Sequence, residues 1–220
     1  MIDLIKKFGT DPLFNEYYFV GGTALASYLD HRISYDIDFV STKKLSPDRL
    51  ETLCVKYGAR YIPDPFESTF KINTGQDHKV YKMQFMIEGV KVEFFYPNDA
   101  LREQIVTDYK DRANDYMGLK RLPLEAIAQL KLVALFGRNK IRDLFDIFYL
   151  FHKNFLSCED IDRFMSLRYH KTFVEFLDEF QDDGSESLDF RDDQEFAMLK
   201  RGELAQLKEL FKREYIQRCI

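Results

Sequence analysis

The sequence predicts an α+β fold, in which an N-terminal mixed β-sheet with flanking helices is followed by a C-terminal helical bundle. From residue 17 to about residue 97, short runs rich in β-branched and aromatic residues alternate with turns and two helical patches. Beyond residue 97, apolar residues recur at helical spacing. The chain has no internal repeat and no low-complexity linker. We therefore expect two domains, an α/β core over 1–97 and a helical domain over 98–220.

Turn and capping residues place the elements of the first domain. A buried strand is expected at 17–20, and a helix at 23–29 follows the Gly21-Gly22 turn with Thr23 near its N-terminus. Ser46-Pro47 begins a helix that ends near residue 57, because proline is favoured in the first turn. The remaining strands are expected at 36–40, 69–73, 80–87 and 90–96, with a tight turn at 88–89 between the last two.

The second domain is predicted to be entirely helical. Gly137 is a natural helix end, and Asn139 is a natural start for the next helix. Helices are expected at about 98–107, 123–137, 140–153, 159–168, 171–180 and 192–217.

Composition excludes several classes of protein. The chain has 220 residues, of which 45% are hydrophobic and 31% charged, as in an ordinary globular protein. With 21 Phe, 13 Tyr and no Trp, its core should be rich in aromatic rings. The start lacks the apolar stretch of a signal peptide, and no apolar run is long enough for a transmembrane helix. Membrane partners are therefore not expected.

Cysteine usage predicts a reducing compartment. Cys54, Cys158 and Cys219 are far apart and odd in number, and no two of them form a CxxC pair. We therefore expect neither a zinc site nor a disulfide framework, and a cytoplasmic location fits best.

Charge is unevenly distributed along the chain. The net charge of −5 argues against nucleic-acid binding by bulk charge. However, residues 110–142 carry eight Lys and Arg against three acids, whereas residues 175–195 carry ten acids and one Arg. Setting the −9 of that acidic segment aside leaves +4, which is compatible with RNA binding in a local groove. The acidic segment is either a solvated loop or a surface for a partner.

A possible phosphate site lies at Gly21-Gly22-Thr23, between the first strand and the helix that follows it. Glycines let the backbone approach an anion closely, and the helix N-terminus offers free N–H groups and a positive dipole end. This motif is weak by itself, because a Gly-Gly turn before a helix is common.

Asp36 and Asp38 strengthen this interpretation. Two residues apart in a strand, they face the same side, while Ile37 and Phe39 face the other, which should be the core. Two adjacent carboxylates repel unless a cation lies between them, and Mg²⁺ is the simplest cation that also leaves positions for phosphate. The alternative is an exposed acidic strand face.

Glu93 offers a third carboxylate within an apolar strand. Burying such a group costs free energy unless it is paired or bound to a metal. Three carboxylates can hold two metal ions for in-line phosphoryl transfer. The alternative is a strand-edge acid that pairs with Lys91 or Lys82.

A second group of charged residues lies in the helical domain. Lys131 falls on an apolar helix stripe, where it must either extend to the surface or reach an anion. Asp143 and Asp146 share a face near the start of the next helix, beside Arg142. On these residues alone, a purely structural pairing of Lys131 with Asp143 across the helical hairpin is the favoured explanation.

Four segments taken together resemble one known family. In order they are 20–25 (VGGTAL), 32–39 (RISYDIDF), 131–135 (KLVAL) and 138–146 (RNKIRDLFD). They resemble the nucleotidyltransferase-like toxins of abortive-infection and toxin–antitoxin systems, of the AbiEii/AbiGii type, within the DNA polymerase β-like nucleotidyltransferase superfamily. The resemblance runs from about residue 17 to residue 150. It implies a nucleotidyltransferase-like core, with the helical domain completing the active-site cleft.

The resemblance also implies roles for individual residues. Gly21, Gly22 and Thr23 would cradle the triphosphate, while Asp36 and Asp38 would bind Mg²⁺, with two ions expected. Glu93 would be the third metal-binding carboxylate and would position the acceptor hydroxyl.

Further roles implied by the resemblance fall on the residues around the loop and the second charged group. Arg32 and Ser34 would brace the loop before Asp36. Lys131 would contact a nucleotide phosphate, and Asp143 would complete the site beside it, supported by Arg142 and Asp146.

The function implied is Mg²⁺-dependent transfer of an NMP group from an NTP to an acceptor hydroxyl, with release of pyrophosphate. The family suggests a toxin that acts on the 3′ end of tRNA and is restrained by a cognate antitoxin protein. Transfer to a protein or to a small molecule would use the same three acids. A non-catalytic nucleotide-binding or partner-binding module of the same fold is a further alternative.

Overall fold

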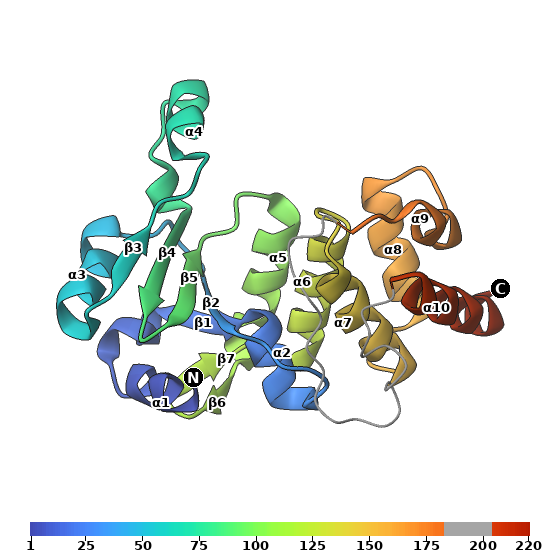
Figure 1. Ribbon diagram of the computed structural model, residues 1–220, viewed down its shortest axis with the longest axis horizontal. Coiled ribbons are helices and arrows are strands. Elements are labelled where there is room, and N and C mark those ends of the chain that lie inside the picture. The colour runs from blue at the N-terminus through green and yellow to red at the C-terminus, as the bar shows by residue number, and fades with distance from the viewer. Residues whose placement is uncertain (183–203) are drawn as a thin grey trace. The chain divides into compact units, whose positions relative to one another are not determined.

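The computed structural model describes residues 1–182 and 204–220, and its strands form a seven-stranded mixed sheet in the order β3-β4-β5-β2-β1-β7-β6 (Figure 1). The central strand β2 runs parallel to β5 and antiparallel to β1, and β1 runs parallel to β7. The expected combination of a mixed sheet with a following set of helices is therefore confirmed. The strands are β1 Tyr17–Val20, β2 Asp36–Ser41, β3 Arg60–Ile62, β4 Lys82–Ile87, β5 Val90–Phe95, β6 Asn114–Tyr116 and β7 Leu119–Arg121.

The chain forms two compact units. The sheet unit comprises Met1–Tyr28 and Ser34–Ile127, and the helical unit comprises Leu29–Ile33 and Ala128–Ile220. The expectation that the chain is entirely helical beyond residue 97 is wrong, because the β6–β7 hairpin lies there and β7 pairs with β1, so the sheet unit extends well beyond that residue. Its helices are α1 Ile2–Gly9, α2 Gly21–Leu29, α3 Pro47–Tyr57, α4 Glu67–Thr74 and α5 Ala100–Tyr109, with short 3-10 turns at Pro12–Glu16, His78–Val80 and Lys110–Arg112.

The two faces of the sheet differ sharply. On one face, alternate residues of the central strands are fully buried, and their aromatic rings stack on one another and on α1 and the turn after it. The rings are those of Phe8, Phe14, Phe19, Phe39, Phe85 and Phe94. This confirms the aromatic-rich core. On the opposite face, the half-buried positions of β2, β4 and β5 carry most of the polar residues discussed below.

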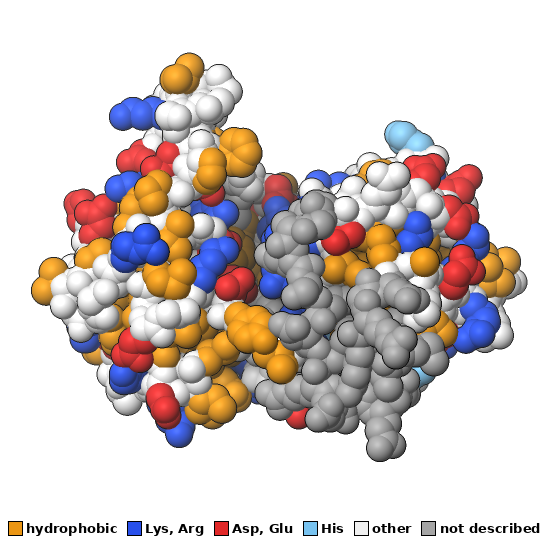
Figure 2. Space-filling model, viewed as in Figure 1, with side chains coloured by type: hydrophobic (Ala, Val, Ile, Leu, Met, Phe, Trp, Pro, Cys, Tyr) orange, Lys and Arg blue, Asp and Glu red, His pale blue; other side chains and the backbone are white. Residues whose placement is uncertain are grey.

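One predicted strand is wrong, because residues 69–73 lie within helix α4, which stands away from the sheet at the end of β3 and β4 (Figure 1). Thr69, Phe70 and Ile72 favour strands, but strand propensity depends on cross-strand packing, and no strand of the described residues pairs with this segment. Helix-start and helix-end signals prevail instead, since Glu67 accepts the Asp64 N–H and Gly75 ends the helix in the left-handed conformation. Phe66 and Ile72 are left strongly exposed on this arm, whose surface is visible in Figure 2.

The helical unit contains α7 Ile141–His152, α8 Cys158–Arg168, α9 Phe173–Glu179 and α10 Leu204–Cys219, together with most of α6 Leu124–Leu135. Helix α10 buries three side chains, and two of their rings pack against Phe151 and Phe173. The helix predicted at 192–217 is confirmed from residue 204 onward. Residues 192–203, and positions 183–195 of the acidic segment, lie outside the described residues. Within the part that is described, every helix is too short or too polar to span a bilayer.

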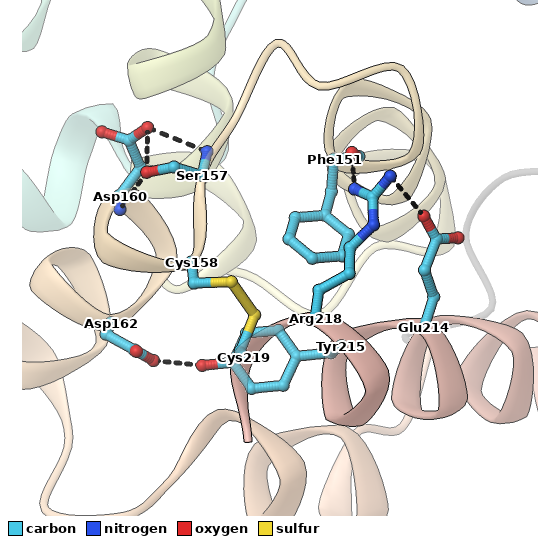
Figure 3. Close-up of a disulfide and its surroundings, with 9 residues drawn as sticks. All are labelled: Phe151, Ser157, Cys158, Asp160, Asp162, Glu214, Tyr215, Arg218 and Cys219. Atoms are coloured by element: carbon cyan, nitrogen blue, oxygen red, sulfur yellow. Dashed lines mark hydrogen bonds and ion pairs between the residues drawn. A yellow bond between two sulfur atoms is a disulfide. The ribbon is translucent and has the colours of Figure 1, made fainter.

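The expectation that the cysteines form no disulfide is wrong. Cys158 at the start of α8 and Cys219 at the end of α10 form a disulfide, with Cα atoms 5.7 Å apart (Figure 3). The two residues are 61 positions apart, so only the packing of α10 brings them together. Beside the disulfide, the Tyr215 hydroxyl donates to Asp162, and Arg218 donates to the Phe151 carbonyl at 2.6 Å. Cys54 is free.

Removing this disulfide should loosen the attachment of α10. A Cys158→Ser/Cys219→Ser variant is expected to lose about 2–4 kcal/mol of unfolding free energy, because the crosslink closes a long loop in the unfolded chain. The measurement is urea unfolding followed by far-UV circular dichroism, with and without dithiothreitol. Reductant should destabilise the wild type and a Cys54→Ser control equally and leave the double variant unchanged. An unfolding midpoint of the wild type that is the same with and without dithiothreitol would contradict this prediction.

Candidate active site

The Gly21-Gly22-Thr23 turn lies directly against Asp38 in the sheet unit. Gly21 has φ of +79°, in the left-handed region that favours glycine. A Cβ atom added there would lie 1.9 Å from Asp38 Oδ2. Any other residue would therefore strain the backbone and collide with this carboxylate. The structure thus brings together the glycine turn and the second aspartate, which are separated in sequence.

Thr23 fastens the turn to the start of β2. Its side-chain hydroxyl donates a hydrogen bond to the main-chain carbonyl of Asp36, and the residue is buried. The hydroxyl thus has a structural partner in β2. The first N–H groups of α2 have no acceptors within the helix and lie at its positive end, so they are the groups suited to bind an anion.

Asp36, Asp38 and Glu93 occupy one face of the sheet. Asp36 and Asp38 are half-buried while Ile37 and Phe39 are fully buried, as alternation predicted. In the parallel pairing of β2 with β5, Asp38 lies opposite Glu93, and Asp36 lies opposite Lys91. Opposite residues share a face, and so do residues two apart in a strand. Asp36 and Asp38 on β2 and Glu93 on β5 therefore lie on the same face of the sheet.

Glu93 has its own partners within the sheet. The Gln84 side-chain amide donates to Glu93 Oε2, and the Nζ atoms of Lys82 and Lys91 lie 3.5 and 4.0 Å from the same oxygen. Lys82 Nζ also lies 3.1 Å from Asp64 Oδ2. Burial alone would lower the pKa of Lys82, but the carboxylates of Glu93 and Asp64 outweigh it and raise that pKa. The pairing of Glu93 with lysines, left open by the sequence, is therefore present.

Asp36 and Asp38 fit a magnesium–nucleotide complex. The described residues contain no cluster of three or more His, Cys, Asp or Glu side chains arranged to hold a metal. Magnesium at nucleotide sites does not require such a cage, since one or two carboxylates are complemented by water and substrate phosphates. Two carboxylates on one strand face, with Asp38 against a glycine turn at a helix N-terminus, match that need.

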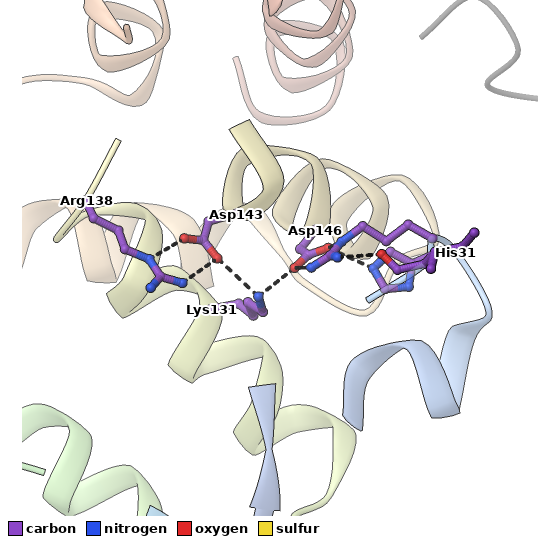
Figure 4. A network of polar contacts seen from close by, with 7 residues as sticks. His31, Lys131, Arg138, Asp143 and Asp146 are labelled. Carbon is purple, nitrogen blue, oxygen red and sulfur yellow. Dashed lines mark hydrogen bonds and ion pairs between the residues drawn. The ribbon is translucent and has the colours of Figure 1, made fainter. Parts of the chain in front are cut away.

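The helical unit holds the second group of charged residues in a buried network (Figure 4). Lys131 Nζ lies 2.7 Å from Asp146 Oδ2 and 3.1 Å from Asp143 Oδ1. Arg138 Nε donates to Asp143 Oδ2 at 2.7 Å. Arg32 donates to both oxygens of Asp146, at 2.6 and 2.9 Å, and His31 Nε2 lies 2.8 Å from Asp146 Oδ1.

These pairs keep both aspartates ionised. Burial raises the pKa of Asp146, yet Arg32 and Lys131 outweigh it and hold that pKa well below its usual value. The pKa of Asp143 is also lowered, because Lys131 and Arg138 outweigh the effect of burial. Lys131, itself only 7% exposed, therefore forms the predicted structural pair with Asp143 and a second pair with Asp146.

The other residues expected at the nucleotide lie in both units. Ser34 is buried in the sheet unit, Arg32 is held by Asp146 in the helical unit, and Arg142 is half-buried in the first turn of α7. The roles of these three residues in nucleotide binding stay predictions, as do those of Lys131 and Asp143.

Sequence reasoning missed His31 and Arg138 as members of the network. A lone histidine carries no spacing signal, and His31 meets Asp146 across 115 positions of sequence. Arg138 was visible only as part of a family motif, and the structure shows that it donates to Asp143.

His31 should make stability depend on pH. Burial lowers the pKa of His31 despite the opposing effect of Asp146, and no described residue hydrogen-bonds its Nδ1 atom. At a pH below about 6.5, the usual pKa of histidine, His31 binds a proton in the unfolded chain but not in the folded chain. Stability should therefore fall as the pH drops below about 6.5, by at most about 1.4 kcal/mol per pH unit.

The test of this pH dependence is urea unfolding at pH 7.5 and at pH 5.5. The loss between the two should be smaller in His31→Gln than in the wild type, whereas His170→Gln, at an exposed position, should behave like the wild type. Equal losses in all three proteins would refute the assignment.

Comparison with known proteins places the chain in a family. Residues 3–215 match the family model of the nucleotidyl transferase AbiEii toxin of type IV toxin–antitoxin systems. An uncharacterized protein of Aquifex aeolicus (strain VF5) is 24% identical over 167 residues, which cover 76% of this chain and 73% of that protein.

Two solved structures are similar to the chain over most of its length. One is a crystal structure of an H. pylori protein whose assignment as a nucleotidyltransferase is provisional, with 18% identity, coverage of 98% and 95%, and a TM-score of 0.49. The other is a tRNA-processing enzyme, with 15% identity, coverage of 80% and 55%, and a TM-score of 0.36. Neither superposition reaches a TM-score of 0.5, so the family assignment depends on the match over residues 3–215.

Proposed function

The chain belongs to the AbiEii nucleotidyl transferase toxin family, and we propose that it transfers an NMP group from an NTP to an acceptor hydroxyl in a Mg²⁺-dependent reaction. The observation that carries this proposal is the contact of the Gly21 turn with Asp38, on the sheet face that also bears Asp36 and Glu93. This contact supports the binding of a triphosphate next to the oxygen ligands that Mg²⁺ prefers. When bound, Mg²⁺ would neutralise phosphate charge and activate the attacking oxygen.

Each residue of the sheet unit has a distinct task in this reaction. The N–H groups at the start of α2 would bind the triphosphate, and Asp36 and Asp38 would hold the metal ions, with Glu93 as the third carboxylate. The acceptor oxygen forms a bond to the α-phosphorus while the bond from that phosphorus to the bridging oxygen breaks. Pyrophosphate leaves with the electron pair, and the hydroxyl proton is directed toward the Glu93 carboxylate.

For the acceptor, we propose the 3′ end of tRNA. The family comprises toxins, and the basic residues between positions 110 and 142 support an anionic partner. In the sheet unit these include Arg112 and Lys120, which are exposed. A toxin of this type requires restraint, so a cognate antitoxin protein is the second proposed partner. The cytoplasm, where tRNA resides, is the proposed location; the Cys158–Cys219 disulfide does not argue for it, because cytoplasmic thiols are kept reduced.

The test is incubation of the protein with each α-labelled NTP, Mg²⁺ and total tRNA, beside a reaction with EDTA. Label should enter RNA from one preferred NTP, with stoichiometric pyrophosphate, and EDTA should abolish it. Label in protein or in small molecules would assign a different acceptor to the same chemistry. Mg²⁺-dependent NTP binding without pyrophosphate, whatever the acceptor, would overturn catalysis in favour of a nucleotide-binding module.

A further inference from the structure

The third carboxylate of the sheet face is held by one of its two oxygens. The Gln84 amide donates to Glu93 Oε2, and the Nζ atoms of Lys82 and Lys91 also approach Oε2. Among the described residues, these are the polar contacts of the Glu93 side chain, so Oε1 is left for a ligand. We propose that Gln84 and Lys82 are positioning residues that present Glu93 Oε1 to the acceptor hydroxyl; this inference rests on the proposed function.

The strand register builds this arrangement. In the antiparallel pairing of β4 with β5, Gln84 lies opposite Glu93, and Lys82 lies two residues away on the same face. Asp38 lies opposite Glu93 on its other side, in β2. Glu93 is thus flanked by an amide donor on one strand and by a proposed metal ligand on the other. Its side chain is 21% exposed, so part of it remains within reach of a substrate.

Asp64 fixes Lys82 in turn. Asp64 Oδ1 accepts the Phe66 N–H at 3.0 Å, and Oδ2 lies 3.1 Å from Lys82 Nζ. The Asp64 side chain is only 12% exposed. The base of the α4 arm therefore holds Asp64, Asp64 holds Lys82, and Lys82 with Gln84 holds one oxygen of Glu93.

An oriented carboxylate matters because transfer is sensitive to small errors of position. A displacement of about 1 Å at a reacting group can reduce turnover about a hundredfold. Without its anchors, the Glu93 carboxylate can rotate about its terminal torsion, which is broad for glutamate. The loss should appear in kcat, because nucleotide binding uses the turn and the aspartates instead.

The experiment compares Lys82→Met with the conservative Lys82→Arg, and with Lys79→Met as a matched control. Lys79 is also a partly buried lysine with an ion pair, at 3.1 Å to Glu51, but does not approach Glu93. Lys82→Met should lower kcat about 10-fold to 100-fold, with the KM for NTP within about twofold of the wild type. Lys82→Arg should recover most of this loss, and Lys79→Met should cause none. Equal kcat in Lys82→Met and the wild type would overturn the proposal.

A second measurement needs neither metal nor turnover. The side-chain amide signals of Gln84, identified by their absence in Gln84→Met, report its hydrogen bond to Glu93 in a ¹H–¹⁵N correlation spectrum. They should shift in Lys82→Met and in Glu93→Gln but not in Lys79→Met. If the Gln84 amide signals do not shift in either substitution, the positioning role of Gln84 and Lys82 is overturned, even if transfer is observed. Conversely, absence of transfer in the wild type with the expected shifts would reject the proposed function while retaining the anchored carboxylate.

Discussion

An Asp36→Asn/Asp38→Asn variant is expected to lose nucleotide transfer by about a thousandfold or more, because it removes the charges that hold the metal at the triphosphate. Asparagine preserves the shape of each side chain, so the contact of Asp38 with the Gly21 turn is retained. Binding of Mg²⁺–NTP should weaken together with turnover. The measurement is release of labelled pyrophosphate under the conditions that support transfer in the wild type.

The same variant should fold, because asparagine keeps the shape of each aspartate. Two carboxylates on one strand face repel each other when no cation is bound, so their neutralisation removes an unfavourable interaction. Asp48→Asn/Asp108→Asn, at exposed positions on α3 and α5, is the matched control and should retain full activity. Full transfer by the Asp36→Asn/Asp38→Asn variant would refute the metal site, and a fall in its thermal midpoint would indicate a structural role instead.

Local sequence patterns were sufficient to predict which side chains lie on the sheet face that bears the candidate site. Alternation in 36–39 predicted which residues point to the core, and the structure agrees. The Gly21 turn was predicted from two adjacent glycines before a helix. The requirement for glycine at position 21, however, comes from the carboxylate of Asp38, which leaves no room for a Cβ atom. Strand pairing supplies that contact, and no single segment encodes it.

Contacts between segments that are distant in sequence could not be predicted from such local patterns. Strands β3, β6 and β7 have three residues each, too few for a period to be recognised. Arg32 and Asp146, 114 positions apart, become partners only through folding of the helical unit. The disulfide has the same origin, since Cys158 and Cys219 meet only after α10 packs against α7, α8 and α9. The anchors of Glu93 depend on the register of β4 with β5, which the tight turn at 88–89 sets.

Asp146→Ala is expected to destabilise the helical unit by about 3–5 kcal/mol, the largest effect on stability that the structure predicts. Asp146 is fully buried and is the common partner of Arg32, Lys131 and His31. Its removal leaves the positive charges of Arg32 and Lys131 in a low-dielectric interior without this carboxylate, and the cost of desolvating them is no longer offset. Far-UV circular dichroism during urea unfolding measures the change, because the chain has no Trp to report by fluorescence.

Asp143→Ala provides the internal comparison. Asp143 is equally buried, but one of its partners, Arg138, has a side chain that is 50% exposed and can be solvated when the carboxylate is lost. Lys131 also keeps Asp146 in that variant. The loss of stability should therefore be clearly smaller than for Asp146→Ala. Equal losses would show that burial of the aspartate, rather than the number of buried cations it serves, determines the stability of the network. In that case Asp146 would not be the centre of the network.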